Sequence, residues 1–164
     1  MTIHLSRRAR GVTPFLAMEI MERAKELEAA GRDIIYLCLG EPDFATPEPV
    51  VKETVAALQG GETAYTHSLG LLELREEITA HYRRRYGVAV DPGQVLVSSG
   101  TSPLMLLLFS ALLDEGDEIV LPDPSYACYP NFIEFVGGRP VLLRTAEADG
   151  FQPRPAAVRA ALSD

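Results

Sequence analysis

Short apolar segments alternate with helix-length segments between residues 95 and 143. The apolar segments are residues 95–97, 119–121 and 141–143, and residues 103–113 and 126–136 between them have helical character. This spacing is typical of βαβ units, in which parallel strands are joined by crossover helices. The predicted fold class is therefore α/β, as part of a three-layer sandwich with a mainly parallel sheet.

A helical segment is expected ahead of this sheet. Residues 14–30 carry an apolar stripe with Thr13 as the predicted N-cap and Pro14 at the first helical position. A strand-like stretch follows at residues 34–39, and further helices are predicted after Thr46 and over residues 71–86. The last helix, near residue 160, has no following strand to cover, so we expect the chain to be a truncated, N-terminal portion of a longer α/β protein.

Composition limits the classes of partner. The formal net charge of −8 disfavours nucleic acid and membrane surfaces, and the longest apolar run, residues 104–109, is too short to cross a bilayer. Cys38 and Cys128 lie in apolar stretches without a C-x-x-C motif, which predicts buried free thiols and a cytoplasmic location. The three histidines have no metal-ligand spacing, so no metal site is predicted.

A possible phosphate site lies where residues 95–103 turn from a strand through a glycine into a helix. The first N–H groups of a helix lack intrahelical partners, and the helix dipole is positive there. Gly100 and the hydroxyls of Ser99, Thr101 and Ser102 would add donors suited to a phosphate monoester. The alternative is that Ser102 only caps the helix ahead of Pro103. Walker A and G-x-G-x-x-G motifs are absent, which argues against nucleotide hydrolysis and dinucleotide redox chemistry.

A second candidate is the loop at residues 122–130, which follows the strand at 119–121. Ligands of parallel sheets bind outside the carboxyl ends of the strands, so this loop is predicted to share an edge with residues 100–102. Tyr126 is then placed to stack on a planar cofactor. The alternative is core packing, because Tyr126, Tyr129 and Ile133 also fit one helical stripe.

Taken in order, these and other short motifs resemble class I/II aminotransferases over nearly the whole chain. The motifs are Leu39-Gly40-Glu41-Pro42-Asp43-Phe44 with Thr46-Pro47; Tyr65-Thr66; Gly70 before Leu74-Arg75-Glu76; Ser99-Gly100-Thr101; Gly116-Asp117-Glu118; and Pro124 with Tyr126 and Tyr129-Pro130.

The resemblance implies the aspartate aminotransferase fold type and a pyridoxal 5′-phosphate cofactor. It implies that Gly100, Thr101 and Ser102 bind the cofactor phosphate and that Tyr126 stacks on the pyridine ring. Tyr65 is similar to the tyrosine that reaches the phosphate of the neighbouring subunit, which implies a homodimer with a shared active site. Gly40 is similar to the residue whose backbone lies against the substrate carboxylate.

The Schiff-base lysine of the family has no counterpart here. Lys25 and Lys52 are the only lysines, and each lies beside a glutamate on an amphipathic helix, as solvated lysines do. In the family the lysine and the arginine for the substrate carboxylate come later in the chain. No catalytic residue is therefore assigned, and the chain by itself is expected to be inactive.

The resemblance implies a parent enzyme of amino acid metabolism that transfers an amino group between an amino acid and a 2-oxo acid. Two alternatives stay open: a pyridoxal-phosphate-dependent C–S lyase of the same fold, and a non-catalytic aminotransferase-like ligand-binding module. We expect residues 1–45 to form an N-terminal arm and part of the small domain. Residues 46–164 would begin the large cofactor-binding domain.

Overall fold

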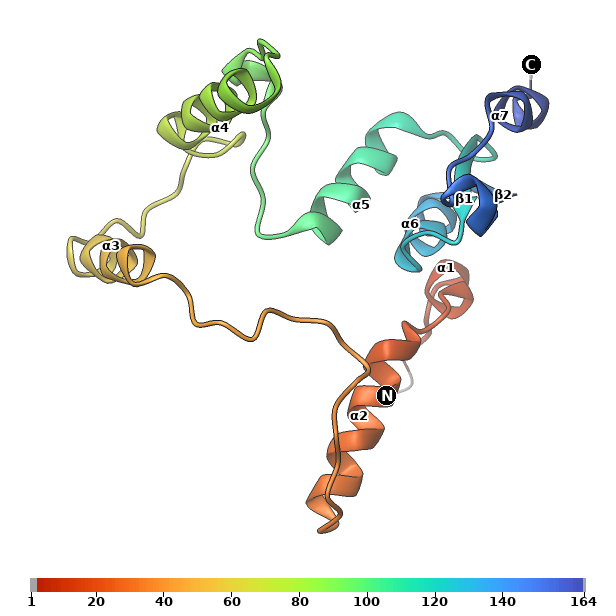
Figure 1. Cartoon of the computed structure of the whole chain (residues 1–164), viewed down its shortest axis with the longest axis horizontal. Coiled ribbons are helices and arrows are strands. Elements are labelled where there is room, and N and C mark those ends of the chain that lie inside the picture. The colour runs from red at the N-terminus through yellow and green to blue at the C-terminus, as the bar shows by residue number, and fades with distance from the viewer. Residues whose placement is uncertain (1–2, 164) are drawn as a thin grey trace. The chain divides into compact units, whose positions relative to one another are not determined.

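The computed structural model describes residues 3–163 and contains two compact units. Among the described residues, one unit consists of residues 3–40 with residues 101–163, and the other of Glu41–Gly100. The elements of the first unit, labelled in Figure 1, are α1 (Arg7–Gly11), α2 (Leu16–Ala29), α5 (Thr101–Leu112), β1 (Glu118–Asp123), α6 (Cys128–Val136), β2 (Arg139–Arg144), η2 (Glu147–Asp149) and α7 (Pro155–Ala161). Those of the second unit are α3 (Glu48–Gln59), α4 (Leu72–Tyr86) and η1 (Pro92–Gln94).

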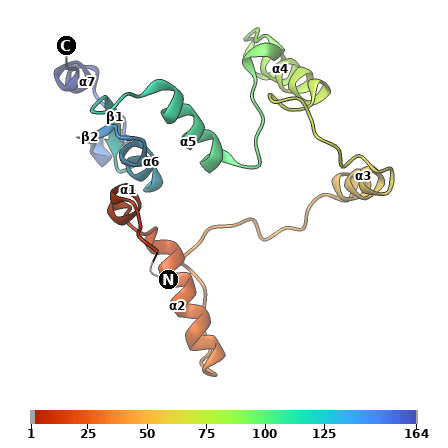
Figure 2. The ribbon, with the colours of Figure 1, turned by 180° about the vertical axis from the view of Figure 1, so that it is seen from behind.

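The strands β1 and β2 pair in parallel, and α6 is the crossover between them. Leu121 is opposite Leu142 in the register, with Glu118 opposite Arg139 at one end and Asp123 opposite Arg144 at the other. The strands and α6 lie next to one another from both viewing directions (Figure 1, Figure 2). The parallel βαβ unit, and with it the predicted α/β class, is confirmed.

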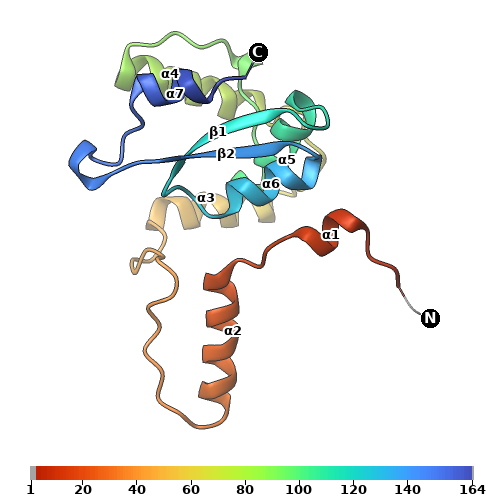
Figure 3. The ribbon, with the colours of Figure 1, turned by 90° about the vertical axis from the view of Figure 1, so that its right-hand side faces the viewer.

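Helices cover both faces of the two strands, as expected for a three-layer arrangement. Successive side chains of a strand point to opposite faces. Ile119 and Leu121 of β1 pack with α5 and α6, whereas Val120 lines a hollow together with Leu162 after α7. Figure 3 shows α6 and α7 on opposite sides of the strands.

The core of the first unit is small and lies on the α5–α6 side of β1. Its buried side chains are Phe109 from α5, Leu121 from β1 and Ile133 from α6, and Ile133 has no exposed surface. Gly138 allows the close packing here, because a Cβ at that position would lie 2.9 Å from Leu113 Cδ1 and 3.0 Å from Ile133 Cγ2. These contacts hold α5 and α6 together at the end of the sheet.

In the second unit, Arg75 joins the start of α4 to two loops. Its Nε donates to the Gly70 carbonyl (3.2 Å) and its Nη1 donates to the Pro92 carbonyl (2.9 Å), while the side chain is buried. Gly70 has φ +95°, and a Cβ there would lie 2.7 Å from the Val97 Cβ. The spacing of Gly70 and Arg75 in the sequence motif therefore has a structural cause.

The predicted strands at residues 34–39 and 95–97 are not strands in the structure. Ile35 is 82% exposed and Leu37 is 89% exposed, so the first segment has no sheet to cover. In the second segment, the Val97 N–H donates to the Leu69 carbonyl (3.0 Å). A single hydrogen bond of this kind does not form the repeated pairing that defines a β-strand. Apolar composition alone does not form a strand when no neighbouring strand pairs with it.

The predicted starts of α2 and α3 are one or two residues early, whereas the helix predicted from residue 103 begins at Thr101. The N-cap of α2 is Phe15 rather than Thr13, and α3 begins at Glu48 with Pro47 as its N-cap. Thr13 is instead engaged through its backbone by Asn131. The short helix α1 was not predicted, although the Ser6 side chain caps it by accepting from the Ala9 N–H (3.1 Å).

No helix among residues 3–163 has the length and hydrophobicity needed to cross a bilayer.

Acid should destabilise the first unit partly through Glu118. Its pKa lies below the ordinary glutamate value, chiefly because of a hydrogen bond with Ser163 and then because of Arg139, whose Nη2 is 2.6 Å from Oε1. A lowered folded-state pKa contributes stability above the unfolded-state pKa, about 4.5, and that contribution is lost as pH falls through the folded-state value. We expect Glu118→Gln to flatten the loss of stability below about pH 4.5 in urea unfolding, compared with Glu19→Gln on α2. Equal pH profiles for the two variants would contradict this.

Candidate functional site

A pocket of about 350 Å³ lies between the start of α5 and the start of α6. Thr101, Ser102 and Met105 line it from α5, and three aromatic side chains line it from the other side: Tyr126, Tyr129 and Phe132. The two hydroxyl residues and Tyr126, predicted to share one edge of the sheet, thus border one pocket. All of these residues belong to the same compact unit.

The polar wall of the pocket is the first turn of a helix. Because α5 begins at Thr101, Ser102 lies inside the first turn, and the interpretation of Ser102 as a cap is wrong. The N–H groups of Gly100, Thr101 and Ser102 have no intrahelical carbonyl to bind, and Pro103 has no N–H. Gly100, with φ 152°, directly precedes this turn. The wall therefore presents free amides and two hydroxyls at the positive end of a helix dipole.

The aromatic wall contains the exposed ring of Tyr126. Tyr126 precedes α6, is 46% exposed, and contacts the Tyr129 ring edge-on at a centroid distance of 5.2 Å. The core-packing interpretation is therefore wrong for Tyr126, whereas Ile133 of the same stripe is the fully buried residue. Tyr126 is available to a ligand in the pocket.

The hydroxyl of Tyr126 remains protonated at neutral pH. Its pKa is raised above the ordinary tyrosine value, chiefly by a hydrogen bond with the Cys128 side chain and by the charge of that group, while Ser102 acts in the opposite direction. Cys128 and Cys38 are free and half-buried, not buried as predicted. A neutral phenol beside hydroxyl groups adds no negative charge that would repel a phosphate.

The other three predicted site residues, Gly100, Gly40 and Tyr65, do not line this pocket. Gly100 directly precedes α5 in the chain. Gly40 ends the first segment of the same unit, and a Cβ at its position would meet no atom within 4 Å. Tyr65 belongs to the second unit and is fully exposed. His67, expected from the sequence to be a solvated or structural histidine, has a structural role, because its Nδ1 accepts from the Leu69 N–H at 3.1 Å.

Both lysines are exposed on helices, as predicted. Lys25 lies on α2, and Lys52 on α3 pairs with Glu48 across one helical turn at 2.6 Å. Within residues 3–163 there is also no cluster of three or more histidine, cysteine, aspartate or glutamate side chains that could hold a metal ion. The pocket chemistry is therefore that of neutral donors and an aromatic ring.

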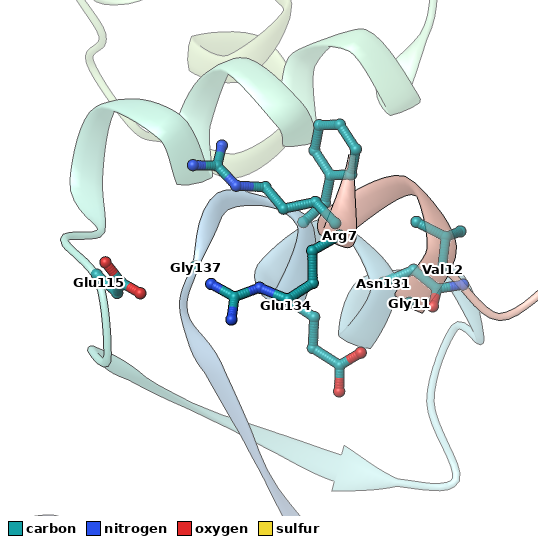
Figure 4. Close-up of a pocket in the computed structure, with 9 residues that line it drawn as sticks. Arg7, Gly11, Val12, Glu115, Asn131, Glu134 and Gly137 are labelled. Carbon is teal, nitrogen blue, oxygen red and sulfur yellow. The ribbon is translucent and has the colours of Figure 1, made fainter. Parts of the chain in front are cut away.

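A larger hollow of about 530 Å³ lies between α1 and α6 and is lined by charged side chains (Figure 4). Arg7 and Arg8 contribute positive charge, and Glu115 and Glu134 contribute negative charge. Because these charges balance, the hollow has no net charge that would favour an anion. Phe15, which contacts the Tyr126 ring, was not predicted as a site residue because nothing local in the sequence links it to the pocket.

The pocket as a whole suits a ligand with a phosphate group and a flat ring. Free helix amides and hydroxyls are good phosphate donors, and an exposed aromatic ring is a stacking surface. Tyr126 follows β1, so the pocket lies near the carboxyl end of that strand, where α/β proteins bind ligands. Fold and site together define an α/β domain whose pocket has one wall of neutral donors and one aromatic wall.

Comparison with known proteins gives the family. Residues 32–164 match the model of aminotransferase class I and II, and the chain belongs to this family. It is 39% identical over 97% of its length to an aspartate aminotransferase of Geobacillus stearothermophilus, and 41% identical over 84% of its length to a (5-formylfuran-3-yl)methyl phosphate transaminase of Methanocaldococcus jannaschii. The aspartate aminotransferase of Thermus thermophilus with maleate superimposes on 99% of the chain with a TM-score of 0.92 and 37% identity.

The chain spans about 40% of the length of these relatives. The covered shares are 40% of the Geobacillus protein, 37% of the Methanocaldococcus protein and 42% of the Thermus chain. The family and the fold are therefore shown for this chain, and the expected N-terminal portion of an aminotransferase is confirmed.

Proposed function

We propose that the complete protein carrying this chain is a pyridoxal 5′-phosphate-dependent aminotransferase that moves an amino group between an amino acid and a 2-oxo acid. The observation that carries this proposal is the pocket in which Thr101, Ser102 and Tyr126 face one space. The family membership supports the cofactor, and the names of the relatives support a transferase over a C–S lyase.

In this proposal each wall of the pocket has one task. Gly100, Thr101 and Ser102 hold the cofactor phosphate through backbone N–H groups and hydroxyls, which fixes the cofactor without a positively charged side chain. Tyr126 stacks on the pyridine ring and shields one face from water. The bound cofactor supplies an electron sink for chemistry at the substrate α-carbon.

Further parts of the proposal concern residues outside the pocket. Gly40 would lie against the substrate carboxylate, and Tyr65 would reach the phosphate site of a second subunit in a cytoplasmic homodimer. The full exposure of Tyr65 is compatible with such a reach. We also propose that residues 1–45 belong to the arm and small domain and residues 46–164 to the large domain. The lysine that carries the cofactor is proposed to lie outside this chain, which would then be inactive alone.

Replacing the stacking ring tests the proposed function. We expect the complete protein to bind pyridoxal phosphate with a visible absorbance change, and Tyr126→Leu to raise the Kd about 3- to 10-fold because the aromatic contact is lost. Tyr126→Phe, which keeps the ring, should bind nearly as well as the wild type. The matched control Tyr82→Leu changes a tyrosine of α4 that is outside the pocket. Failure of the wild type to bind the cofactor would overturn the proposal.

Product analysis separates the reactions. Aspartate with 2-oxoglutarate is the first pair to test, because two of the relatives above are aspartate aminotransferases. A new amino acid formed in equal amount to a new 2-oxo acid is the expected result. Pyruvate and ammonia from a sulfur amino acid would identify a C–S lyase instead. Cofactor binding without either reaction would identify a non-catalytic module.

A further inference from the structure

The segment ahead of α2, residues 3–15, is called the N-terminal arm here. The side chain of Asn131 on α6 binds the backbone of this arm. Asn131 Oδ1 accepts from the Thr13 N–H (3.2 Å), and Asn131 Nδ2 donates to the Thr13 carbonyl (2.8 Å), across a separation of 118 residues. An amide side chain carries both the donor and the acceptor that this pair requires. Figure 4 shows Asn131 beside Gly11 and Val12 of the arm.

Two residues after this anchor, Phe15 contacts the stacking tyrosine. The centroids of the Phe15 and Tyr126 rings are 6.2 Å apart with an interplanar angle of 68°, an edge-to-face contact. Tyr129 contacts Tyr126 in the same manner from α6. The Tyr126 ring therefore has one aromatic neighbour from the arm and one from the helix, and it still retains 46% exposure.

These contacts form a chain that leads from α6 through the arm to the pocket. Asn131 holds the backbone at Thr13 through two hydrogen bonds, and this restricts the position of Phe15, two residues further along. The Phe15 ring in turn limits the orientations of the Tyr126 ring. A ring that is already ordered loses less conformational freedom when a ligand stacks on it. Loss of the anchor would therefore weaken binding even though neither Asn131 nor Phe15 lines the pocket.

We propose that Asn131 and Phe15 are positioning residues that hold Tyr126 in the orientation needed to stack on the pyridine ring of the cofactor. The inference rests on the proposed function, because it assigns a role toward pyridoxal phosphate. It goes beyond that function by making the N-terminal arm a part of the cofactor site.

The test uses the complete protein and pyridoxal phosphate. Asn131→Ala and Phe15→Leu should each raise the Kd about 3- to 10-fold and lower the induced circular dichroism per bound cofactor, a signal that depends on the geometry of the ring site. Phe15→Tyr keeps the aromatic edge, so this variant should retain the wild-type Kd and the wild-type induced circular dichroism. Thr13→Ala is the matched control, since Asn131 bonds only to the backbone of Thr13.

The possible failures are distinguishable. If the wild type binds the cofactor and both variants keep its Kd and its dichroism, the positioning role is wrong and the proposed function stands. If the wild type does not bind, the proposed function and this inference both fail. Should Asn131→Ala not fold, the comparison of Phe15→Leu with Phe15→Tyr decides the question, because neither substitution changes the hydrogen bonds to Thr13.

Discussion

Replacing Thr101 with valine and Ser102 with alanine together is expected to weaken binding of pyridoxal phosphate by the complete protein at least about 100-fold. Each hydroxyl is proposed to donate to a phosphate dianion, and hydrogen bonds to charged groups contribute about 1.5–3 kcal/mol each. The two residues line the same pocket as Tyr126, so the double substitution would remove both hydroxyl hydrogen bonds to one phosphate. Equilibrium titration followed by absorbance measures the change.

Pyridoxal, which lacks the phosphate, provides the control for this double variant. Its affinity should change by less than about twofold, because the hydroxyls would have no phosphate to bind. Thr101→Ser, which keeps a hydroxyl, should bind pyridoxal phosphate nearly as well as the wild type. Equal losses for the phosphorylated and unphosphorylated ligands would show that the start of α5 does not recognise the phosphate.

Replacing Ile133 with alanine is expected to lower the free energy of unfolding by about 2–5 kcal/mol, because it removes buried methyl groups and leaves a cavity. Ile133 is the fully buried residue of the core. Because Gly138 and Leu113 already pack closely beside it, the neighbouring side chains have little room to move in and fill the cavity. Ile133→Val should cost about 0.5–1.5 kcal/mol. Urea unfolding followed by circular dichroism measures both changes.

Ile35→Ala is the matched control for the core substitution. The same side chain is removed, but Ile35 is 82% exposed, so the change in stability should stay within about 0.5 kcal/mol. Similar losses at the two positions would show that Ile35 is covered in the protein in solution. A small loss at Ile133 alone would show that the α5–α6 core does not hold the unit together.

The parts of the fold that local sequence predicted well are those with a local cause. The helix predicted over residues 71–86 is found at Leu72–Tyr86, and it ends at Gly87, which adopts the left-handed conformation with φ 67° that favours glycine. The strands β1 and β2 lie within one residue or two of their predicted centres because they pair with each other across a single helix. The candidate pocket residues Thr101, Ser102 and Tyr126 could be predicted because each lies at or just before the start of a helix, α5 or α6.

The incorrect predictions share a physical reason. Residues 34–39 are apolar enough for a strand, yet a strand requires a partner, and the described residues provide none there. Thr13 has the chemistry of an N-cap, but its backbone is held by a residue 118 positions away. Local preference is worth about 1 kcal/mol at such positions, which a pair of tertiary hydrogen bonds outweighs.

By itself, the sequence determined the α/β class, the parallel βαβ unit, the family motifs and the candidate residues for a phosphate site, because periodicity and glycine positions act over a few residues. Only the tertiary structure decided that Tyr126 is exposed while Ile133 is buried, that Ser102 lies inside the first turn of α5, and that Asn131 anchors the arm at Thr13. These outcomes depend on contacts between segments distant in the chain. The energies of such contacts cannot be predicted from local sequence patterns.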